Sequence, residues 1–208
     1  MLPAGIRAIA WDIDGTLIDS EPLHHRALLA GSAHFGCDLG DLDEDAFCGI
    51  HMHDVWRRLA PRLPATLGMA DWIAAIERHY IAERHRLMPM PGAIDAFDGF
   101  AGRGLIQVCV SNSARAIVDA NLDALGIAGR IAFSISLDDV TEGKPAPEPY
   151  RMACERLGLP PAQVMAIEDS APGLASARAA GLICAVYRRQ GSRHIERVEA
   201  GRRRGSCR

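Results

Sequence analysis

Between residues 105 and 187, short apolar runs alternate with amphipathic segments, and this alternation constrains the fold more than any other feature of the chain. The apolar runs have the length of strands, and the segments between them have the length of helices. The pattern predicts strands at 6–13, 105–111, 131–136, 164–169 and 182–187, and helices at 114–126, 147–159 and 171–181. Strands that alternate with helices form a parallel sheet covered on both faces. We therefore expect an α/β fold with a doubly wound parallel sheet.

Residues 18–89 interrupt the alternation. From Pro22 to about Met88 they consist of amphipathic helical segments and show no convincing strand pattern. Because this block lies between the first predicted strand and the others, we predict that it is a small α-helical domain inserted over the sheet. The α/β core would then comprise residues 1–17 and 90–208.

Residues 188–208 form a basic tail that contains eight arginines against two glutamates and lacks a strong apolar pattern. We expect a short helix there at most, followed by disorder. Such a tail could also be an arm that binds nucleic acid. The formal net charge of −3 for the whole chain gives no reason to expect nucleic acid as a partner.

Composition excludes several other classes of protein. No apolar run is long enough to span a bilayer, and the N-terminal segment lacks the pattern of a signal peptide. The six cysteines include no C-x-x-C pair, which is typical of reduced, mostly buried thiols rather than a zinc site. We expect a cytoplasmic protein with no membrane partner.

Polar side chains follow three of the predicted strands, at the carboxyl ends where open parallel sheets bind their ligands. The first strand ends in Asp12 and Asp14, the second in Ser111 and Asn112, and a later one in Glu168 and Asp169. Lys144, the only lysine of the chain, precedes the helix that leads to that later strand. Each group alone could be a turn or a helix cap. Their shared position at one edge of the sheet favours a functional site.

Four carboxylates and one ammonium group are poorly balanced in charge. Two like charges at 4 Å repel by about 4 kcal/mol at an effective dielectric constant of 20. A divalent cation relieves this repulsion, and oxygen ligands together with a substrate phosphate favour Mg²⁺. With the metal bound, Asp12 could attack phosphorus as a nucleophile. Asp14 could protonate the leaving oxygen and then activate water.

These motifs resemble those of the haloacid dehalogenase superfamily of phosphotransferases, over residues 1–187. The matching motifs are Asp12-Ile13-Asp14-Gly15-Thr16, Ser111, Lys144 in "GKPAPEP", and Glu168-Asp169-Ser170. Trp11 replaces the phenylalanine that the family usually carries before the first aspartate. The resemblance implies a Rossmann-like core and a phosphoric monoester hydrolase that forms an aspartyl phosphate on Asp12.

The resemblance also implies a role for each matching residue. Asp12 and the backbone carbonyl of Asp14 would bind Mg²⁺ together with Asp169, and Glu168 would bind the metal directly or through water. Ser111 and Lys144 would bind the transferring phosphoryl group, and we expect Asn112 beside them to do the same. The bond between Lys144 and Pro145 is often cis in relatives.

The inserted block resembles the helical cap of the phosphoglycolate phosphatase and β-phosphoglucomutase branch. A cap excludes water and contacts the leaving group. Histidines gather in this block, and we expect His24 and His51 to face the substrate. His24 occupies a place where β-phosphoglucomutases also carry a histidine.

Three functions remain open at this stage. The first is a phosphatase of a small phosphate ester, such as a sugar phosphate or phosphoglycolate, acting as a monomer or homodimer. The second is a mutase like β-phosphoglucomutase. Such mutases carry a cap arginine at a position where this chain has Met52, and the cap of this chain also lacks a lysine. The third is a phospho-acceptor switch like a receiver domain, which would lack both the long helical insert and a second aspartate like Asp14. We favour hydrolysis.

Overall fold

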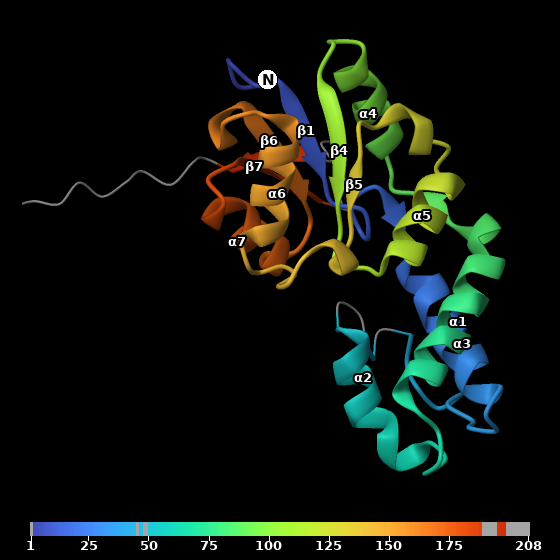
Figure 1. Ribbon diagram of the computed structural model, residues 1–208. Coiled ribbons are helices and arrows are strands. Elements are labelled where there is room, and N and C mark those ends of the chain that lie inside the picture. Colours follow the sequence, from blue (N-terminus) through green and yellow to red (C-terminus); the bar gives the residue numbers. More distant parts are fainter. Residues whose placement is uncertain (1, 45, 48–49, 189–194, 199–208) are drawn as a thin grey trace, which may run out of the picture.

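A six-stranded sheet forms the centre of the molecule (Figure 1). The computed structural model describes residues 2–44, 46–47, 50–188 and 195–198. The sheet has the strand order β5-β4-β1-β6-β7-β8. Its strands are β1 (Ala8–Trp11), β4 (Ile106–Val110), β5 (Ser134–Ile135), β6 (Val164–Glu168), β7 (Ile183–Tyr187) and β8 (Ile195–Val198). The first five run parallel, as predicted, and β8 pairs antiparallel with β7.

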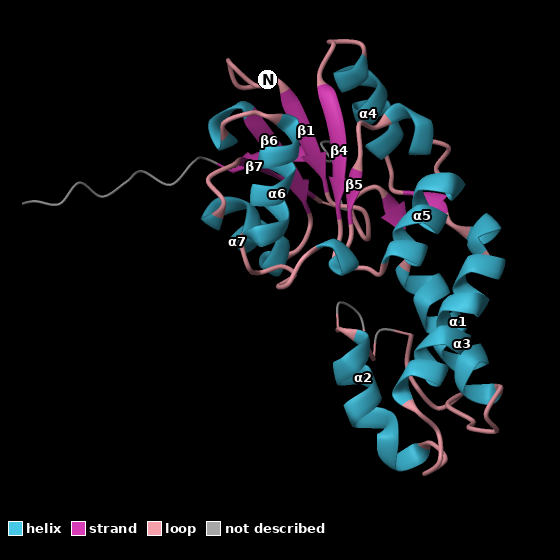
Figure 2. Cartoon of the chain, viewed as in Figure 1, coloured by secondary structure: helices cyan, strands magenta, loops and turns pink. Residues whose placement is uncertain are grey.

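Helices cover both faces of the sheet (Figure 2). On one face, Ile9 and Trp11 of β1 pack in a hydrophobic cluster with α4 (Ala93–Ala101) and α5 (Arg115–Ala124). On the other, Ala8 and Ala10 pack with α6 (Glu148–Leu157) and α7 (Ala171–Ala179). All four residues of β1 are fully buried, because alternate side chains point to opposite faces and both are covered. The predicted doubly wound α/β fold is therefore confirmed.

Trp11 places an indole N–H in this core, and that N–H needs a hydrogen-bond acceptor. A phenylalanine at the same position would need none. Gln107 of β4 supplies the acceptor, with 2.8 Å between Trp11 Nε1 and Gln107 Oε1. The amide nitrogen of Gln107 donates in turn to the backbone oxygen of Phe97. The departure from the family's usual phenylalanine is thus matched by a buried polar partner on the neighbouring strand.

The chain between β1 and β4 is mainly helical, and we call residues 18–89 the helical insert. It contains α1 (Glu21–Ala33), α2 (Met52–Leu59) and α3 (Met69–Ala82). Helices α1 and α3 approach so closely that a Cβ on Gly31 would clash with the backbone of Ile76. In Figure 1 the helical insert lies beyond the carboxyl ends of β1 and β4, with α2 below them.

Two short strands join the helical insert to the rest of the chain. Strand β2 (Ile18–Asp19) pairs antiparallel with β3 (Met88–Pro89), so the chain leaves and returns at one place. Both strands lie at the ends of the block, at or beyond the limits of the range 22–88 in which no strand was expected, and each is too short to show a period-2 pattern. Short 3-10 helices complete the secondary structure: Ala60–Arg62, Arg84–Arg86, Ala128–Arg130, Leu137–Asp139 and Pro161–Gln163.

The C-terminal segment differs from its prediction where the structure describes it. Residues 195–198 form strand β8 at the sheet edge rather than a helix, because edge β7 offers unpaired backbone groups that local composition does not reveal. The predicted disorder falls on residues 189–194 and 199–208, which lie outside the described residues. The described cysteines, Cys37, Cys109, Cys154 and Cys184, are buried free thiols, as expected. No helix of the described ranges combines the length and apolarity needed to cross a membrane.

Candidate active site

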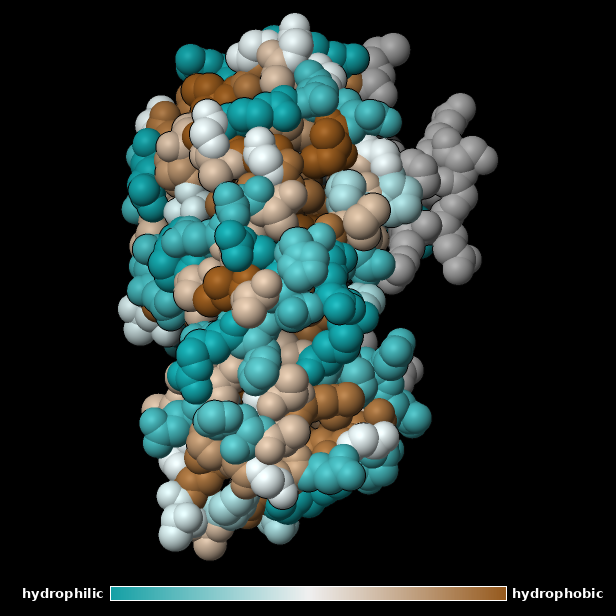
Figure 3. Space-filling model, turned by 90° about the vertical axis from the view of Figure 1, so that its right-hand side faces the viewer, coloured by the Kyte–Doolittle hydropathy of each residue, from teal (hydrophilic) through white to brown (hydrophobic). Residues whose placement is uncertain are grey.

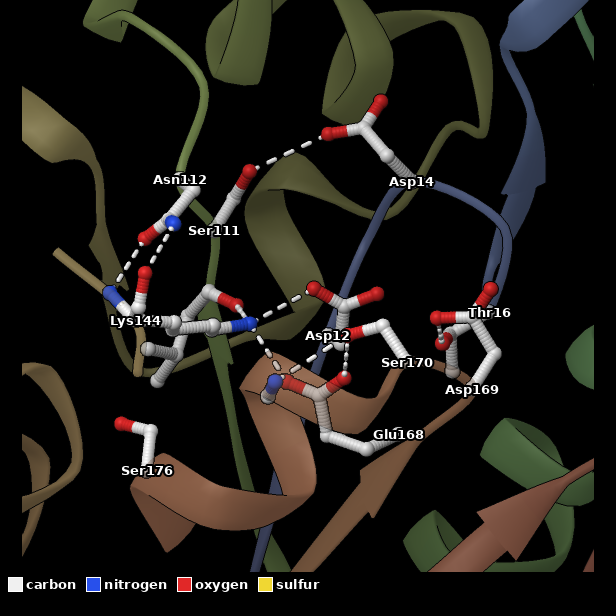
Figure 4. Close-up of polar contacts among 12 residues, drawn as sticks. Asp12, Asp14, Thr16, Ser111, Asn112, Lys144, Glu168, Asp169, Ser170 and Ser176 are labelled. Carbon is white, nitrogen blue, oxygen red and sulfur yellow. Dashed lines mark hydrogen bonds and ion pairs between the residues drawn. The ribbon is translucent and has the colours of Figure 1, made fainter. Parts of the chain in front are cut away.

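The carboxyl ends of β1, β4 and β6 bring the predicted polar residues together (Figure 4). Asp12 follows β1, Ser111 follows β4, and Glu168 ends β6. All three side chains are buried, as is Lys144, which comes from the loop before α6. The fold thus brings acidic residues as distant in sequence as Asp12 and Glu168 together with one basic residue, Lys144.

Lys144 is the centre of this cluster. Its Nζ donates to Asp12 Oδ1 at 2.6 Å, to Glu168 Oε1 at 2.6 Å and to the backbone oxygen of Val110 at 2.7 Å. Burial alone would lower the pKa of Lys144, but the charges of Asp12 and Glu168 raise it above its ordinary value. The amine is therefore an ammonium group whose three protons are all directed to acceptors.

The backbone of Lys144 is held by the side chain of Asn112. Asn112 Oδ1 accepts from the Lys144 N–H at 2.7 Å, and Asn112 Nδ2 donates to the Lys144 carbonyl at 2.9 Å. The peptide bond from Lys144 to Pro145 is cis, as the resemblance implied. Gly143 leaves room for this contact, since a Cβ there would meet Asn112 Oδ1 at 2.7 Å. Both polar atoms of the Asn112 side chain thus form hydrogen bonds with the backbone of Lys144.

Glu168 is fully buried and both of its carboxylate oxygens accept hydrogen bonds. Besides Lys144, Oε1 accepts from the Tyr150 hydroxyl at 2.7 Å, and Oε2 accepts from Ser170 Oγ at 3.1 Å. Ser170 also caps α7 by accepting from the backbone N–H of Gly173. Tyr150 was not predicted as a site residue, because nothing in its local sequence separates it from an ordinary core tyrosine.

Gly173 gives a direct test of this packing. A Cβ at that position would clash with all three carboxylate atoms of Glu168. Gly173→Ala is expected to displace the carboxylate and lower the rate of phosphate-ester hydrolysis on the order of 10²-fold. Steady-state kinetics measure the loss.

Gly99→Ala is the matched control for Gly173→Ala, because a Cβ on Gly99 of α4 meets nothing within 4 Å. This control should keep full activity and gain about 0.5–1 kcal/mol of stability, since alanine favours helix. Equal activity in the two variants would contradict the tight packing around Glu168.

Asp12, Glu168 and Asp169 offer oxygens that all lie within 4.8 Å of one another, so the group could hold a metal ion. Asp12 Oδ2 is buried and has no hydrogen-bond partner, which leaves one carboxylate oxygen available as a ligand. Burial and the negative charge of Glu168 raise the pKa of Asp12. A divalent cation would remove that cost, so the residues present fit a metal.

Asp169 is the exposed member of the acidic group, and its Oδ1 accepts from Thr16 Oγ1 at 3.3 Å. Gly15 makes this approach possible. Its φ of 80° lies in the left-handed region, and a Cβ there would clash with the Asp169 carboxylate. The glycine of the first motif is therefore required both by its backbone angle and by its neighbour.

Asp14 points toward Ser111 and away from the Asp12 carboxylate (Figure 4). Its Oδ2 accepts from Ser111 Oγ at 3.1 Å and from Ser113 Oγ at 2.8 Å. Its Oδ1 accepts from Asn121 Nδ2 at 3.0 Å and lies 3.7 Å from His24 Nε2. Burial alone would raise the pKa of Asp14, but the contacts with His24 and Ser113 lower it below its ordinary value. His24 of the helical insert thus reaches the cluster.

His51 behaves differently from His24. It is exposed at the start of α2, and the structure shows no contact between it and the described residues of the cluster. Asn121 was not among the predicted site residues. Its signal was a polar residue four positions after Ile117, on the buried face of a helix, where an apolar residue is the rule.

Comparisons with known proteins agree with the fold. A family model described as haloacid dehalogenase-like hydrolase matches residues 6–181. Protein CbbY of Rhodobacter capsulatus is 35% identical over 188 residues, which cover 85% of this chain and 83% of that protein. A phosphoglycolate phosphatase of Cupriavidus necator is 33% identical over 188 residues, 86% of this chain and 80% of that one.

A solved structure is also similar. A mutant of CbbY from Rhodobacter sphaeroides, crystallised in complex with xylulose-(1,5)bisphosphate, has a TM-score of 0.79 and 29% sequence identity to this chain. The match covers 88% of this chain and 86% of that one. The likeness therefore extends over the sheet and the helical insert.

Proposed function

This chain belongs to the haloacid dehalogenase-like hydrolase family and is a phosphoric monoester hydrolase, and on that premise we propose that it dephosphorylates a small phosphorylated metabolite. The substrate class is a sugar phosphate or a compound like phosphoglycolate. The names of the similar phosphoglycolate phosphatase and of the CbbY complex with a sugar bisphosphate support this class. The observation that carries the proposal is the buried group of Asp12, Lys144 and Glu168.

Asp12 is the proposed nucleophile. Its carboxylate attacks phosphorus, the bond between phosphorus and the ester oxygen breaks, and an aspartyl phosphate forms. Asp14, which must hold a proton when the substrate is bound, gives that proton to the departing oxygen, so the alcohol leaves neutral. Asp14 then takes a proton from water, which attacks the phosphoryl group and releases Asp12 and inorganic phosphate. The leaving oxygen lies opposite the attacking one, which agrees with an Asp14 carboxylate directed away from Asp12.

Lys144 and Ser111 are the proposed ligands of the transferring phosphoryl group. The ammonium group of Lys144 already contacts Asp12, so a phosphoryl group on Asp12 comes within its reach. Ser111 Oγ stands next to Asp14, on the side of the departing oxygen. Asn112 holds the backbone of Lys144 and thereby aims its side chain. Its contact with the phosphoryl group stays a prediction.

Asp12, Asp169 and the backbone carbonyl of Asp14 are the proposed ligands of Mg²⁺. The metal, when bound, neutralises charge on the phosphoryl oxygens and on the acids. Asp12 and Asp169 suit this role because Asp12 keeps a free oxygen and Asp169 is exposed. Glu168 stays a predicted ligand, directly or through water, since it offers an oxygen to the group that could hold a metal. Its two oxygens also accept hydrogen bonds from Lys144, Tyr150 and Ser170. We propose that Glu168 orients Lys144.

The helical insert is the proposed cap, and residues 1–17 and 90–208 the proposed core domain. The antiparallel pair of β2 and β3 supports this division, because it brings the two ends of the helical insert together. His24 is placed to contact the leaving group, because it faces Asp14. A contact of His51 with substrate, a cytoplasmic location and a monomeric or homodimeric state stay predictions.

The chemistry separates hydrolysis from the mutase alternative. A mutase must hold both phosphates of a bisphosphate, and leaving one without a cationic partner is costly. Met52 occupies the position of the mutase cap arginine, and the helical insert contains no lysine. Hydrolysis needs only the site around Asp12. The receiver-like alternative is not supported, because a hydrolase family model matches residues 6–181, which include the long helical insert.

Phosphate release from a panel of sugar phosphates, 2-phosphoglycolate and nucleotides tests the proposal. We expect hydrolysis of at least one small ester, complete loss of it with EDTA, and recovery when Mg²⁺ is restored. Activity that survives exhaustive chelation would rule out the metal. A parallel reaction with β-glucose 1-phosphate and catalytic bisphosphate serves as the comparison. Rapid formation of glucose 6-phosphate with little free phosphate would establish the mutase instead.

A further inference from the structure

Four side chains form a closed circuit at the junction of the core and the helical insert. The Tyr80 hydroxyl donates to Asn121 Oδ1 at 2.7 Å, and Asn121 Nδ2 donates to Asp14 Oδ1 at 3.0 Å. The Tyr80 ring stacks on the His24 ring, with centroids 4.5 Å apart. His24 Nε2 in turn lies 3.7 Å from Asp14 Oδ1, which closes the circuit. The circuit therefore ties the proposed acid/base to two helices of the insert.

The order of donors in this circuit fixes the direction of the Asn121 amide. A tyrosine hydroxyl that donates must meet the amide oxygen, which turns the amide nitrogen toward the Asp14 carboxylate. Burial, and then the charge of Asp14, raises the pKa of Tyr80, so its hydroxyl keeps the proton. Tyr80 and Asn121 are both fully buried, so water does not replace either partner. An unpaired amide in this position would be costly.

The two hydrogen-bonded partners come from different parts of the fold. Tyr80 belongs to α3 of the helical insert, and Asn121 belongs to α5, which covers the sheet. Figure 3 shows this side of the molecule, where mainly hydrophilic residues cover the junction. The exposed ion pair of Arg84 and Asp123 joins the same two parts there. Tyr80 and Asn121 are thus a buried polar contact beneath a solvated rim.

We propose that the Tyr80–Asn121 pair positions the Asp14 carboxylate. Its orientation then depends on whether the helical insert is seated, that is, whether α3 packs against α5 of the core. This inference rests on the proposed role of Asp14 as acid and base. When the insert is seated, Asn121 holds Asp14 Oδ1 while Ser111 and Ser113 hold Oδ2. A movement of α3 away from α5 withdraws Tyr80 and leaves the amide free to turn. Proton transfer is then restricted to the state in which the insert covers the substrate.

The pair acts on proton transfer and leaves the attack of Asp12 untouched. The two steps separate with p-nitrophenyl phosphate, whose leaving group departs as a stable anion and needs no proton. Formation of the aspartyl phosphate should therefore survive a loss of the pair. The attack of water still needs Asp14 as a base, so breakdown of the aspartyl phosphate should slow.

The experiment is rapid-mixing kinetics with p-nitrophenyl phosphate on wild type, Tyr80→Phe, Asn121→Leu and the double variant. We expect steady-state rates about tenfold lower for Tyr80→Phe and about 100-fold lower for Asn121→Leu, following the fold-changes typical of acid–base groups. Each variant should still release about one nitrophenolate per active site in an initial burst. The double variant should match Asn121→Leu, because Tyr80 acts through Asn121.

Tyr187→Phe is the matched control, since it also removes a buried tyrosine hydroxyl, which donates to the Pro91 carbonyl at 3.0 Å. It should keep the wild-type rate. Tyr80→Phe removes a single oxygen and keeps the ring stack on His24, so it tests the pair even if Asn121→Leu folds poorly. Wild-type rates in Tyr80→Phe and Asn121→Leu would overturn the inference, as would a burst that shrinks in proportion to the rate. Full hydrolysis by Asp12→Asn would instead overturn the proposed function.

Discussion

Asp12→Asn is expected to lower kcat by at least about 10⁴-fold, on the scale seen when a nucleophile is removed from other hydrolases. An amide oxygen is a far weaker nucleophile than a carboxylate, and no aspartyl phosphate can form. Asp12 also carries the one buried carboxylate oxygen of the cluster that has no hydrogen-bond partner, so its loss weakens the proposed metal site as well. Phosphate release under saturating substrate and Mg²⁺ measures the effect.

A stability measurement separates lost chemistry from lost structure in this variant. Burial and the charge of Glu168 raise the pKa of Asp12, so the ionised carboxylate is unfavourable in the metal-free protein. The amide keeps an acceptor for Lys144 and removes one negative charge. We expect a melting temperature equal to or above that of wild type when no metal is present. Turnover near the wild-type rate would remove the basis of the whole mechanism.

Lys144→Arg is expected to lose on the order of 10²–10³-fold in kcat although the charge is kept, as when a preorganised donor is lost. The ammonium group is enclosed by Asp12, Glu168 and the Val110 carbonyl at 2.6–2.7 Å, and the ring of Tyr150 lies 5.3 Å away. A guanidinium group is broad and planar, so it cannot meet three acceptors arranged around one point. Steady-state kinetics report the loss, and thermal unfolding reports any strain.

Arg130→Lys provides the opposite exchange at an exposed position. Arg130 pairs with Asp98 on the surface and lies outside the cluster around Asp12. Either cation serves at such a site, so activity should not change. If Lys144→Arg were as active as Arg130→Lys, the identity of the only lysine in the chain would have no catalytic meaning.

The parts of the site that could be predicted are those set by local sequence and by topology. Parallel strands end at one edge, so the residues after β1, β4 and β6 had to meet once the alternation of strands and helices was recognised. That reasoning brought Asp12, Ser111, Glu168 and Lys144 together, and the structure places them in contact or in one cluster. The short strand β5 was predicted over 131–136 and spans Ser134–Ile135, since edge strands pair over little of their length.

The parts that could not be predicted depend on partners far away in the chain. Asn112 follows a strand, as a phosphate ligand would, but only the folded loop shows that Lys144 takes both of its polar atoms. Tyr80 and Asn121 are 41 positions apart, and a helix pattern cannot tell which buried polar groups face each other. Long-range polar pairing carries no periodicity, whereas burial does.

The two-residue ladder of Ile18–Asp19 and Met88–Pro89 has a consequence for how this enzyme could be rebuilt. The segment between these two strands leaves the core and returns to it at neighbouring positions. Exchanging this segment therefore changes no strand order and leaves the acidic cluster in place. A chimera that grafts the corresponding helices of a relative onto this ladder should fold and keep its phosphoryl chemistry. The chimera should then prefer the same phosphate esters as the relative that supplied the helices, because the helices contact the leaving alcohol while the core breaks the bond to phosphorus.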